Sequence, residues 1–204
     1  MGIDKYARIY GFVGEFYPWG KEDILFLISL YDKLDEHIER FKAVSGLKCI
    51  EDCGLCCGKS NFEATAMEFM PLAVDLWIRK EISPWLEKIS LLEQGGPCVF
   101  YKADASVGEG KCSVYSFRPL ICRLFGFSAR TDKYGKRLLI TCGCMKKAHP
   151  LEYKQSQGVA FQNIIPRMSD YSIQAPTLGK QIPINEAAKT ALEKMEMIMK
   201  LKAG

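Results

Sequence analysis

The sequence has no long apolar run, and its first residues are not mainly apolar. A membrane-spanning helix needs about 18 or more consecutive, mainly apolar residues, and every apolar run in this chain is far shorter. Residues 1–8 also lack the positively charged start and the following apolar stretch of a secretory signal. We therefore expect no membrane span and a location in the reducing cytoplasm.

Signatures of several enzyme classes and of nucleic-acid binding are absent as well. No glycine-rich loop has the spacing of a phosphate cradle between a strand and a helix, and residues 108–111 also fail this test. No serine, histidine and acid are arranged as in the serine hydrolases. The net charge of +4 comes from basic residues interleaved with acids, so the sequence predicts no nucleic-acid partner.

Histidine is scarce, whereas cysteine is abundant. The 204 residues include two histidines and nine cysteines. Disulfide frameworks persist mainly in secreted proteins, and cysteine clusters of cytosolic proteins more often bind metals or act in catalysis. The odd number, and the strained ring that a bridge between adjacent Cys56 and Cys57 would need, also argue against disulfides. We expect His37 and His149 to be exposed or core residues rather than metal ligands.

Four cysteines crowd into residues 49–57. Thiolates so close in sequence suit a soft metal centre, because zinc and iron both favour sulfur ligands in a tetrahedral arrangement. Gly54 and Gly58 in this stretch permit tight turns, whereas an α-helix would space the thiols poorly. The stretch therefore predicts a metal-binding loop that contains Cys49, Cys53, Cys56 and Cys57.

Apolar periodicity predicts a mostly helical chain. Residues 21–44 have helical spacing, and Gly46 follows them as a stop. Thr65 and Glu68 resemble a capping box that opens a second helix. Ser83, which precedes a proline, predicts the N-cap of a third helix.

Shorter elements and loops are expected elsewhere. We expect residues 1–20 to be irregular and residues 174–183 to form a loose stretch. Residues 124–128 and 137–141 predict a small hairpin, and a last amphipathic helix follows Asn185. The sequence thus favours an α+β fold, mostly helical, with a small irregular cysteine-rich metal core and a short hairpin surrounded by helices.

The remaining cysteines complete a recognisable pattern. The cluster that ends in adjacent cysteines is followed in order by Cys98, Cys112, Tyr115, Arg118, Pro119 and Cys122. Over about residues 47–147 this order resembles the CxxCxxCC cysteine-cluster family, also called YkgJ-type proteins. The resemblance implies a zinc- or iron-chelating domain. Members of the family are called Fe–S-cluster-containing proteins or Fe–S oxidoreductases, and the module also occurs in proteins described as flagellin lysine methylases.

The resemblance also implies eight metal ligands. Three residues separate Cys49 from Cys53, where the family name implies two. Cys142 and Cys144 both qualify as the last ligand. We choose Cys144 because the basic residues 146–147 follow it, as in the family, and Cys142 is then a spare thiol. The implied ligands are Cys49, Cys53, Cys56, Cys57, Cys98, Cys112, Cys122 and Cys144.

Two arginines flank Cys122. Arg118 and Arg123 are candidate cofactor-binding residues, because a cation close to several thiolates would offset their negative charge and raise a reduction potential. A surface salt bridge is the alternative interpretation.

Eight thiolates exceed the four that a tetrahedral zinc holds. They allow two four-cysteine sites, or one cluster and a cysteine-rich zinc site. Zinc sites usually contain paired Cys-x-x-Cys motifs, whereas Cys98, Cys112 and Cys122 are dispersed. We therefore favour an iron–sulfur cluster of the 4Fe-4S type over Zn2+. The first three cysteines also have the radical SAM spacing, but no βα-barrel pattern follows them.

These features predict an Fe–S oxidoreductase or electron-transfer protein that acts with an unknown redox partner or substrate. The alternative is a structural zinc-binding or metal-chelating module, to which the family resemblance adds a link with SAM-dependent lysine methylation. We expect three parts. They are an N-terminal segment and helix over residues 1–46, the metal-binding domain over residues 47–147, and a C-terminal helical extension over residues 148–204 that packs on the same core.

Overall fold

The computed structural model describes residues 6–50, 53–58, 61–93, 95–104, 109–161, 163–174 and 178–203. The predictions for residues 1–20, 108–111 and 174–183 fall partly on residues outside these ranges. In the described part the chain is mostly helical with short antiparallel strand pairs, which confirms the predicted α+β class. None of the helices in these ranges combines the length and the apolar character needed to cross a membrane.

The elements follow one another along the chain without an internal repeat. The helical elements are α1 (Ala7–Phe16), η1 (Pro18–Gly20), α2 (Lys21–Ser45), η2 (Met67–Phe69), α3 (Met70–Ile78), α4 (Ile82–Ser90), η3 (Tyr115–Phe117), α5 (Leu120–Leu124), α6 (Gly143–Ala148), α7 (Pro150–Ser156), η4 (Val159–Phe161), α8 (Met168–Ser172) and α9 (Ile184–Ala203). The strands are β1 (Glu63–Thr65), β2 (Tyr101–Asp104), β3 (Glu109–Cys112), β4 (Ser128–Thr131), β5 (Arg137–Ile140) and β6 (Gln181–Pro183).

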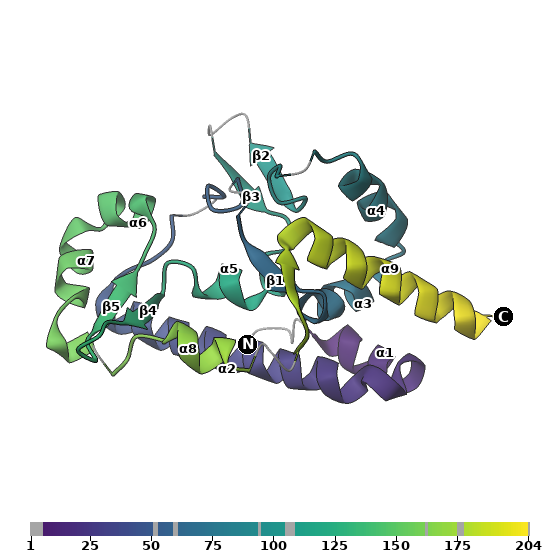
Figure 1. Cartoon of the computed structure of the whole chain (residues 1–204), viewed down its shortest axis with the longest axis horizontal. Coiled ribbons are helices and arrows are strands. Elements are labelled where there is room, and N and C mark those ends of the chain that lie inside the picture. The colour runs from purple at the N-terminus through teal and green to yellow at the C-terminus, as the bar shows by residue number, and fades with distance from the viewer. Residues whose placement is uncertain are drawn as a thin grey trace.

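The longest helix, α2, organises the core. Its apolar residues recur at helical spacing, and Ile24, Leu27, Leu34 and Phe41 are completely buried. The helix ends where predicted, because Gly46 adopts a left-handed conformation with φ of 72° that other residues disfavour. Figure 1 shows α2 along one edge of the molecule, with α1, α3 and α9 towards one end and α6, α7 and the β4–β5 hairpin towards the other.

Two local predictions were wrong. Part of the N-terminal stretch that we expected to be irregular is the helix α1, whose Ile9 and Val13 lie four residues apart and are both buried. The helix α4 begins at Ile82, and Glu81 rather than Ser83 is its N-cap residue. The helix therefore starts before the serine, and the proline that follows it lies inside the first turn.

Thr65 and Glu68 form the predicted capping box. The backbone N–H of Glu68 donates to Thr65 Oγ1 at 3.2 Å, and the N–H of Thr65 donates to Glu68 Oε1 at 2.9 Å. This box opens η2, which continues into α3. Pro71 lies in the first turn of α3, where a missing N–H breaks no helical hydrogen bond.

The strands of the described residues form three separate antiparallel pairs. The pair β4–β5 is the predicted hairpin, although its first strand is Ser128–Thr131 rather than residues 124–128. The pair β2–β3 forms a second hairpin. The pair β1–β6 joins segments that lie far apart in the sequence, with Ala64 opposite Ile182. The strand β6 falls within the stretch that we expected to be loose, and this part of the prediction was wrong because β1 supplies its hydrogen-bonding partner.

The C-terminal helix α9 closes the fold. It packs against α3 and α4, and its Ala188, Ala191, Leu192 and Met195 are buried, which confirms the predicted core face. At its first turn Asn185 reaches a distant loop. The Asn185 Oδ1 atom accepts from the N–H of Val99 at 2.9 Å, and Asn185 Nδ2 donates to the carbonyl of Pro97 at 3.0 Å. The start of α9 therefore holds the segment that contains Cys98.

Candidate metal centre

The nine cysteines come from five segments of the chain. Four lie in the loop of residues 49–57 after α2, and a fifth, Cys98, follows α4. Cys112 is the last residue of β3 and Cys122 lies in α5. Cys142 is the N-cap residue of α6, and Cys144 lies in its first turn. None of the nine is joined in a disulfide in the structure.

Turns shape the loop of residues 49–57 as predicted. The N–H of Cys53 donates to the carbonyl of Ile50 at 3.2 Å, and the N–H of Cys57 donates to that of Gly54 at 2.8 Å. The carbonyl of Cys57 in turn accepts from the N–H of Cys98 at 2.9 Å. The loop is thereby tied to the segment that Asn185 holds.

A close approach of two backbones explains Gly54. A Cβ atom at this position would collide with the carbonyl of Gly110 and the ring of Tyr101 in the β2–β3 hairpin. Gly110 is constrained within the hairpin itself, because its Cβ would meet the carbonyl of Lys102 on the paired strand. Gly54 therefore lets the cysteine loop lie against the hairpin that ends in Cys112.

The cysteines surround a cavity of about 480 Å³. Seven of the nine thiols line it, together with Arg118, one lysine and a largely apolar wall. Cys57 and Cys98 are not among the lining residues, and Cys98 is buried. Six of the eight predicted ligands therefore share this wall, and so does Cys142, which we expected to be a spare thiol. The lining cysteines are Cys49, Cys53, Cys56, Cys112, Cys122, Cys142 and Cys144.

Hydrogen bonding between sulfurs shifts the pKa values of three of the thiols in opposite directions. Cys57 interacts with both Cys112 and Cys56, and this hydrogen bonding raises the pKa of Cys57 while lowering those of Cys56 and Cys112. The charge of Arg118 lowers the pKa of Cys56 and Cys112 further. Cys56 and Cys112 are thus the thiols most readily present as thiolate, the form that binds metals.

Burial has the opposite effect on three other thiols. Burial, followed by the charges of Cys53 and Cys142, raises the pKa of Cys49 to about 11. Burial also raises the pKa of Cys98 to about 11. For Cys122 burial raises the pKa, with the charges of Cys98 and Cys112 next. These thiols lose their protons when a cation is bound beside them.

The two arginines that flank Cys122 lie in different surroundings. Arg118 lines the cavity, its guanidinium lies 3.5 Å from the centre of the Tyr115 ring, and its Nη1 donates to the carbonyl of Cys122 at 3.3 Å. Its charge lowers the pKa of Cys49, Cys56, Cys112 and Cys122. Arg118 is therefore placed to offset the charge of bound thiolates.

Arg123 does not line the cavity. Its guanidinium is 2% exposed and forms an ion pair with Asp35 on α2 at 2.6 Å. It also donates to the carbonyls of Arg118 and Ser116 and to the Tyr6 hydroxyl. Arg123 thus forms a salt bridge, as the alternative interpretation proposed. Its own side chain is buried, whereas that of Asp35 is partly exposed. Arg123 holds the backbone that presents Arg118.

Sequence reasoning found Glu68 as a capping residue but missed its second role. Its other carboxylate oxygen, Oε2, accepts from the N–H of Leu120 at 2.8 Å. Leu120 is the first residue of α5, which carries Cys122. Glu68 is 2% exposed, and burial raises its pKa. No sequence signal identifies this contact, because the two residues are far apart in the chain.

The histidines take no part in the cavity. His37 Nδ1 lies 3.0 Å from the Tyr171 hydroxyl, and His149 is the N-cap residue of α7. Neither is among the residues that line the cysteine cavity.

The cysteine sulfurs are the right kind of ligand for a soft metal, although their present arrangement does not form a metal site. Among the described residues no group of three or more His, Cys, Asp or Glu side chains is arranged so that it could hold a metal ion. Seven reduced sulfurs on one cavity wall nevertheless have the softness that zinc and iron select. Binding a metal therefore requires the thiols to move together, which couples metal binding to the folding of these loops.

One comparison with known proteins identified a family. Residues 48–143 match the model of the family CxxCxxCC, described as "Putative zinc- or iron-chelating domain". No curated protein and no solved structure matched the chain. The match begins just before Cys49 and ends just after Cys142. It includes every residue that lines the cavity except Cys144, Met145 and Lys147.

Proposed function

We propose that the metal centre of this chain, whose residues 48–143 match the model of a zinc- or iron-chelating domain, is an iron–sulfur cluster that transfers electrons. The observation that carries the proposal is the cavity with seven thiols and one arginine. Thiolates are the usual ligands of iron–sulfur clusters, and a bound cluster supplies one-electron chemistry. The proposed ligands are the eight cysteines that the family resemblance implies, with Cys144 last.

The shape of the cavity supports a cluster over a single ion. A tetrahedral zinc and a four-iron cluster each take four thiolates, so the seven cysteines that line the cavity, from four segments, leave the choice to its size. Its volume of about 480 Å³ lies in the range of about 300–1,000 Å³ that small-molecule sites occupy. There is room for a polyatomic group and for access by a reactant.

The residues around the thiols have separate roles in this proposal. Phe125, Phe127 and Leu55 form part of the apolar wall, and they would limit the access of water to the cluster. Arg118 would offset the charge of the thiolates and raise the reduction potential. Electrons would pass to or from a partner protein in the cytoplasm, since the exposed rim of the cavity leaves a route for contact.

The alternative function is a structural zinc site. The observation that favours it is that Cys57 and Cys98 do not line the cavity and are joined by a backbone hydrogen bond of 2.9 Å, with Cys98 buried. Structural zinc sites are closed and inaccessible, and they stabilise the fold without any redox role.

Metal analysis distinguishes the two functions. Protein purified without oxygen is analysed for iron, acid-labile sulfide and zinc, and its visible absorption is followed during reduction. We expect iron and sulfide in comparable amounts and a colour that bleaches reversibly. Zinc alone in a colourless protein would refute the redox proposal and favour the structural one.

A variant connects the cluster to the cysteines. Replacing Cys112 by serine removes a thiol at the cavity wall, and we expect most of the iron and the colour to be lost. The control is Ser113→Ala, which alters the neighbouring exposed residue and leaves every sulfur in place. Full iron content in the Cys112 variant would show that this thiol is no ligand.

A further inference from the structure

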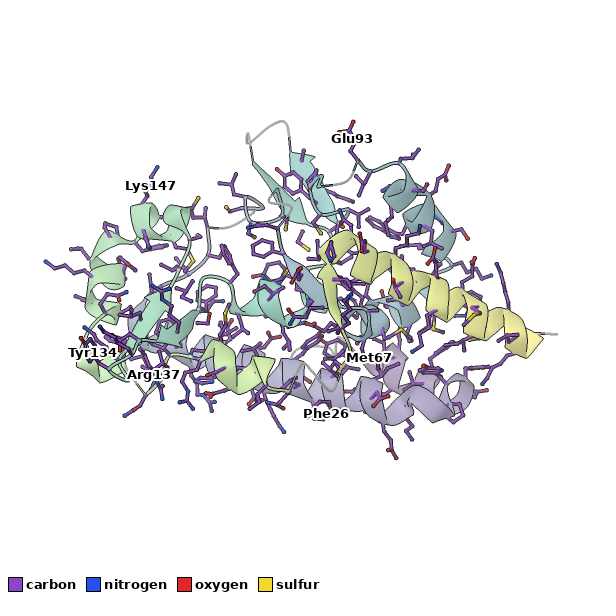
Figure 2. All side chains as sticks on the ribbon, in the orientation of Figure 1. Phe26, Met67, Glu93, Tyr134, Arg137 and Lys147 are labelled. Atoms are coloured by element: carbon purple, nitrogen blue, oxygen red, sulfur yellow. The ribbon has the colours of Figure 1, made fainter. Side chains whose placement is uncertain are left out.

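A second cavity lies away from the cysteines. It has a volume of about 510 Å³, and residues of α1, α3, α4 and α9 line it. It shares no lining residue with the cysteine cavity. Figure 2 shows Lys147, which lines the cysteine cavity, on α6, whereas the last turns of α9, which line the second cavity, lie at the other end of the molecule. We call the second cavity the distal cavity.

Apolar side chains from three helices form one part of the distal cavity. Phe12 comes from α1, Trp77 and Ile78 come from α3, and Ile82 comes from α4. The ring of Phe12 stacks on that of Phe16, with 5.0 Å between the ring centres. Cavities of about 300–1,000 Å³ with aromatic walls and a few polar groups are typical of small-molecule sites. The distal cavity therefore suits the apolar body of a small organic molecule.

Charged groups form another part of the lining. Lys80, Glu196 and Lys200 all line the distal cavity. Lys200 Nζ lies 3.2 Å from a carboxylate oxygen of Glu196 on the same helix, so these two charges balance. Lys80 forms no ion pair within the part of the chain that the structure describes. The lining thus has one positive charge that none of the described acids neutralises.

The backbone of Lys80 is strained. Apart from glycines, Lys80 is the one residue in the described ranges with a positive φ, which is 60°. Its N–H donates to the carbonyl of Trp77 at 2.9 Å, and the N–H of Glu81 donates to the carbonyl of Leu76 at 2.8 Å. This pair of hydrogen bonds is the Schellman motif, in which glycine usually takes the place of Lys80 because a side chain disfavours the left-handed conformation. The end of α3 alone therefore does not explain a lysine here.

The position of its side chain does explain the lysine. Strained residues occur preferentially at active sites and ligand clamps, where the side chain has a use that offsets the cost. The side chain of Lys80 lines the distal cavity. The acids that flank it in sequence, Asp75 and Glu81, pair with Arg79 instead. An ammonium group beside an apolar wall complements the carboxylate of a ligand.

We propose that the distal cavity binds a small organic carboxylate with an aromatic body, and that Lys80 recognises the carboxylate. The aromatic body lies against Trp77 and Phe12, which supply flat apolar surfaces on two different helices. Ser83 lines the same cavity and adds a hydroxyl that can donate to the ligand. This inference goes beyond the proposed metal centre and does not depend on which metal the cysteines bind.

Two probes of nearly equal size separate charge from shape. Naphthalene-2-carboxylate has an aromatic body and one negative charge, and naphthalene-2-carboxamide replaces the charge by a neutral amide. Calorimetric titration of the full chain, purified without oxygen, gives both dissociation constants, and chemical-shift mapping of backbone amides locates each bound probe. We expect the carboxylate to bind about tenfold more tightly, because hydrogen bonds to charged groups are the stronger ones. The shifts should fall in residues 77–83 and 196–200.

A variant tests the role of Lys80 without endangering the fold. Lys80→Gly removes the ammonium group and relieves the left-handed backbone, so the urea midpoint of unfolding should rise while the two probes bind equally well. Lys80→Arg retains the charge and should retain the preference for the carboxylate. The matched control is Lys194→Gln, an exposed lysine of α9 that does not line the cavity, and it should bind both probes as the wild-type protein does.

Four other outcomes would overturn the inference. Equal affinities of the wild-type protein for the two probes would show a cavity without anion recognition. A carboxylate preference that persists in Lys80→Gly would remove the role of Lys80. Shifts confined to the cysteine-bearing segments would place the anion at Arg118 instead, and binding of neither probe would show that the distal cavity is no site for this class of ligand. None of these outcomes changes the metal content, so the proposed metal centre is tested separately.

Discussion

Glu68 shows how a single buried carboxylate can serve two segments. One of its oxygens accepts from the capping box at Thr65, and the other accepts from the N–H of Leu120 at the start of α5. An ionised carboxylate needs such donors when it is buried, because it has lost its water. The geometry of the helix that carries Cys122 thus depends on a carboxylate more than fifty residues earlier in the chain.

We predict that Glu68→Gln destabilises the protein at neutral pH by about 1–3 kcal/mol, because an amide cannot accept at both ends and one buried N–H loses its partner. The free energy of unfolding from urea titrations measures this change. Glu63→Gln, at an exposed position of β1, is the control and should change stability little. Equal stabilities of the two variants would contradict the role of Glu68.

The same residue predicts a pH dependence. Burial raises the pKa of Glu68, so between the unfolded pKa of about 4.3 and the folded value the native state binds the additional proton. The part of its contribution that depends on this proton is therefore complete below the unfolded pKa and is lost as the pH rises through the folded pKa, whereas the accepted hydrogen bonds remain. Urea titrations from acid to neutral pH should show this slope in the wild-type protein and a weaker one in Glu68→Gln.

At the scale of elements, Arg123 connects α2 to the segment before α5. Its charge is buried, and Asp35 on α2 is its ion-pair partner. Breaking a buried ion pair by removing one partner leaves a charge without compensation. We predict that Asp35→Asn costs about 3 kcal/mol of unfolding free energy, near the low end for buried pairs, since Asp35 itself is partly exposed. Chemical denaturation measures the loss, with Glu36→Gln on the exposed face of α2 as the control.

The contact between the cysteine loop and the β2–β3 hairpin gives another prediction. Gly54→Ala should displace the loop, because its Cβ would overlap the carbonyl of Gly110, and the metal content should fall by more than half. Gly58→Ala is the matched control, since its Cβ meets only a carbonyl at 3.6 Å, an ordinary contact distance. Metal analysis of both proteins decides the point. Full loading of Gly54→Ala would show that the close approach is not needed.

Local signals explain which elements could be predicted. The helix α2 has an uninterrupted apolar stripe and a glycine stop, and α9 has a similar stripe. Both helices could therefore be predicted from their own sequences alone. The pair β1–β6 could not be predicted, because three-residue strands have no measurable periodicity and their pairing depends on the tertiary fold. The contact of Glu68 with Leu120 and the ion pair of Arg123 with Asp35 also join residues far apart in the sequence. They could not be predicted for the same reason.

The candidate site was predictable to a similar extent. The spacing of the cysteines identified the type of site, because thiol chemistry is local to each residue. The grouping of the thiols was not predictable, since it depends on how α6 and the loop after α2 meet. Cys142 illustrates this limit. Its place in the sequence suggested a spare thiol, and in the structure it lines the same cavity as Cys144, so the choice between the two stays a prediction.

At the scale of the whole molecule, one cluster of buried apolar residues extends through all three expected parts of the chain. The division into residues 1–46, 47–147 and 148–204 stays a prediction. The metal-binding segments lie between elements of this common core, and their own contacts are mainly turns and short hairpins. Their stability should therefore depend on the metal more strongly than that of α2 or α9.

We predict that removing the metal lowers the melting temperature and increases hydrogen exchange selectively. Amides of residues 49–50, 53–58, 98–104, 109–124 and 142–148 should exchange faster, whereas those of α2 and α9 should stay protected. Thermal melting and hydrogen-exchange mass spectrometry before and after chelation test this expectation, and returning the metal should restore both signals. Uniform exchange across the chain would indicate a global effect instead.

The two hydrogen bonds of Asn185 also concern the order in which the protein is made. The ribosome synthesises the segment around Cys98 long before residue 185, yet Asn185 holds that segment by two hydrogen bonds. The strand β1 is likewise synthesised long before β6, its hydrogen-bonding partner. The cysteine-bearing loops therefore emerge without the partners that fix them. We expect the thiols to remain open to oxidation during translation and to accept their metal only once the C-terminal helix has left the ribosome.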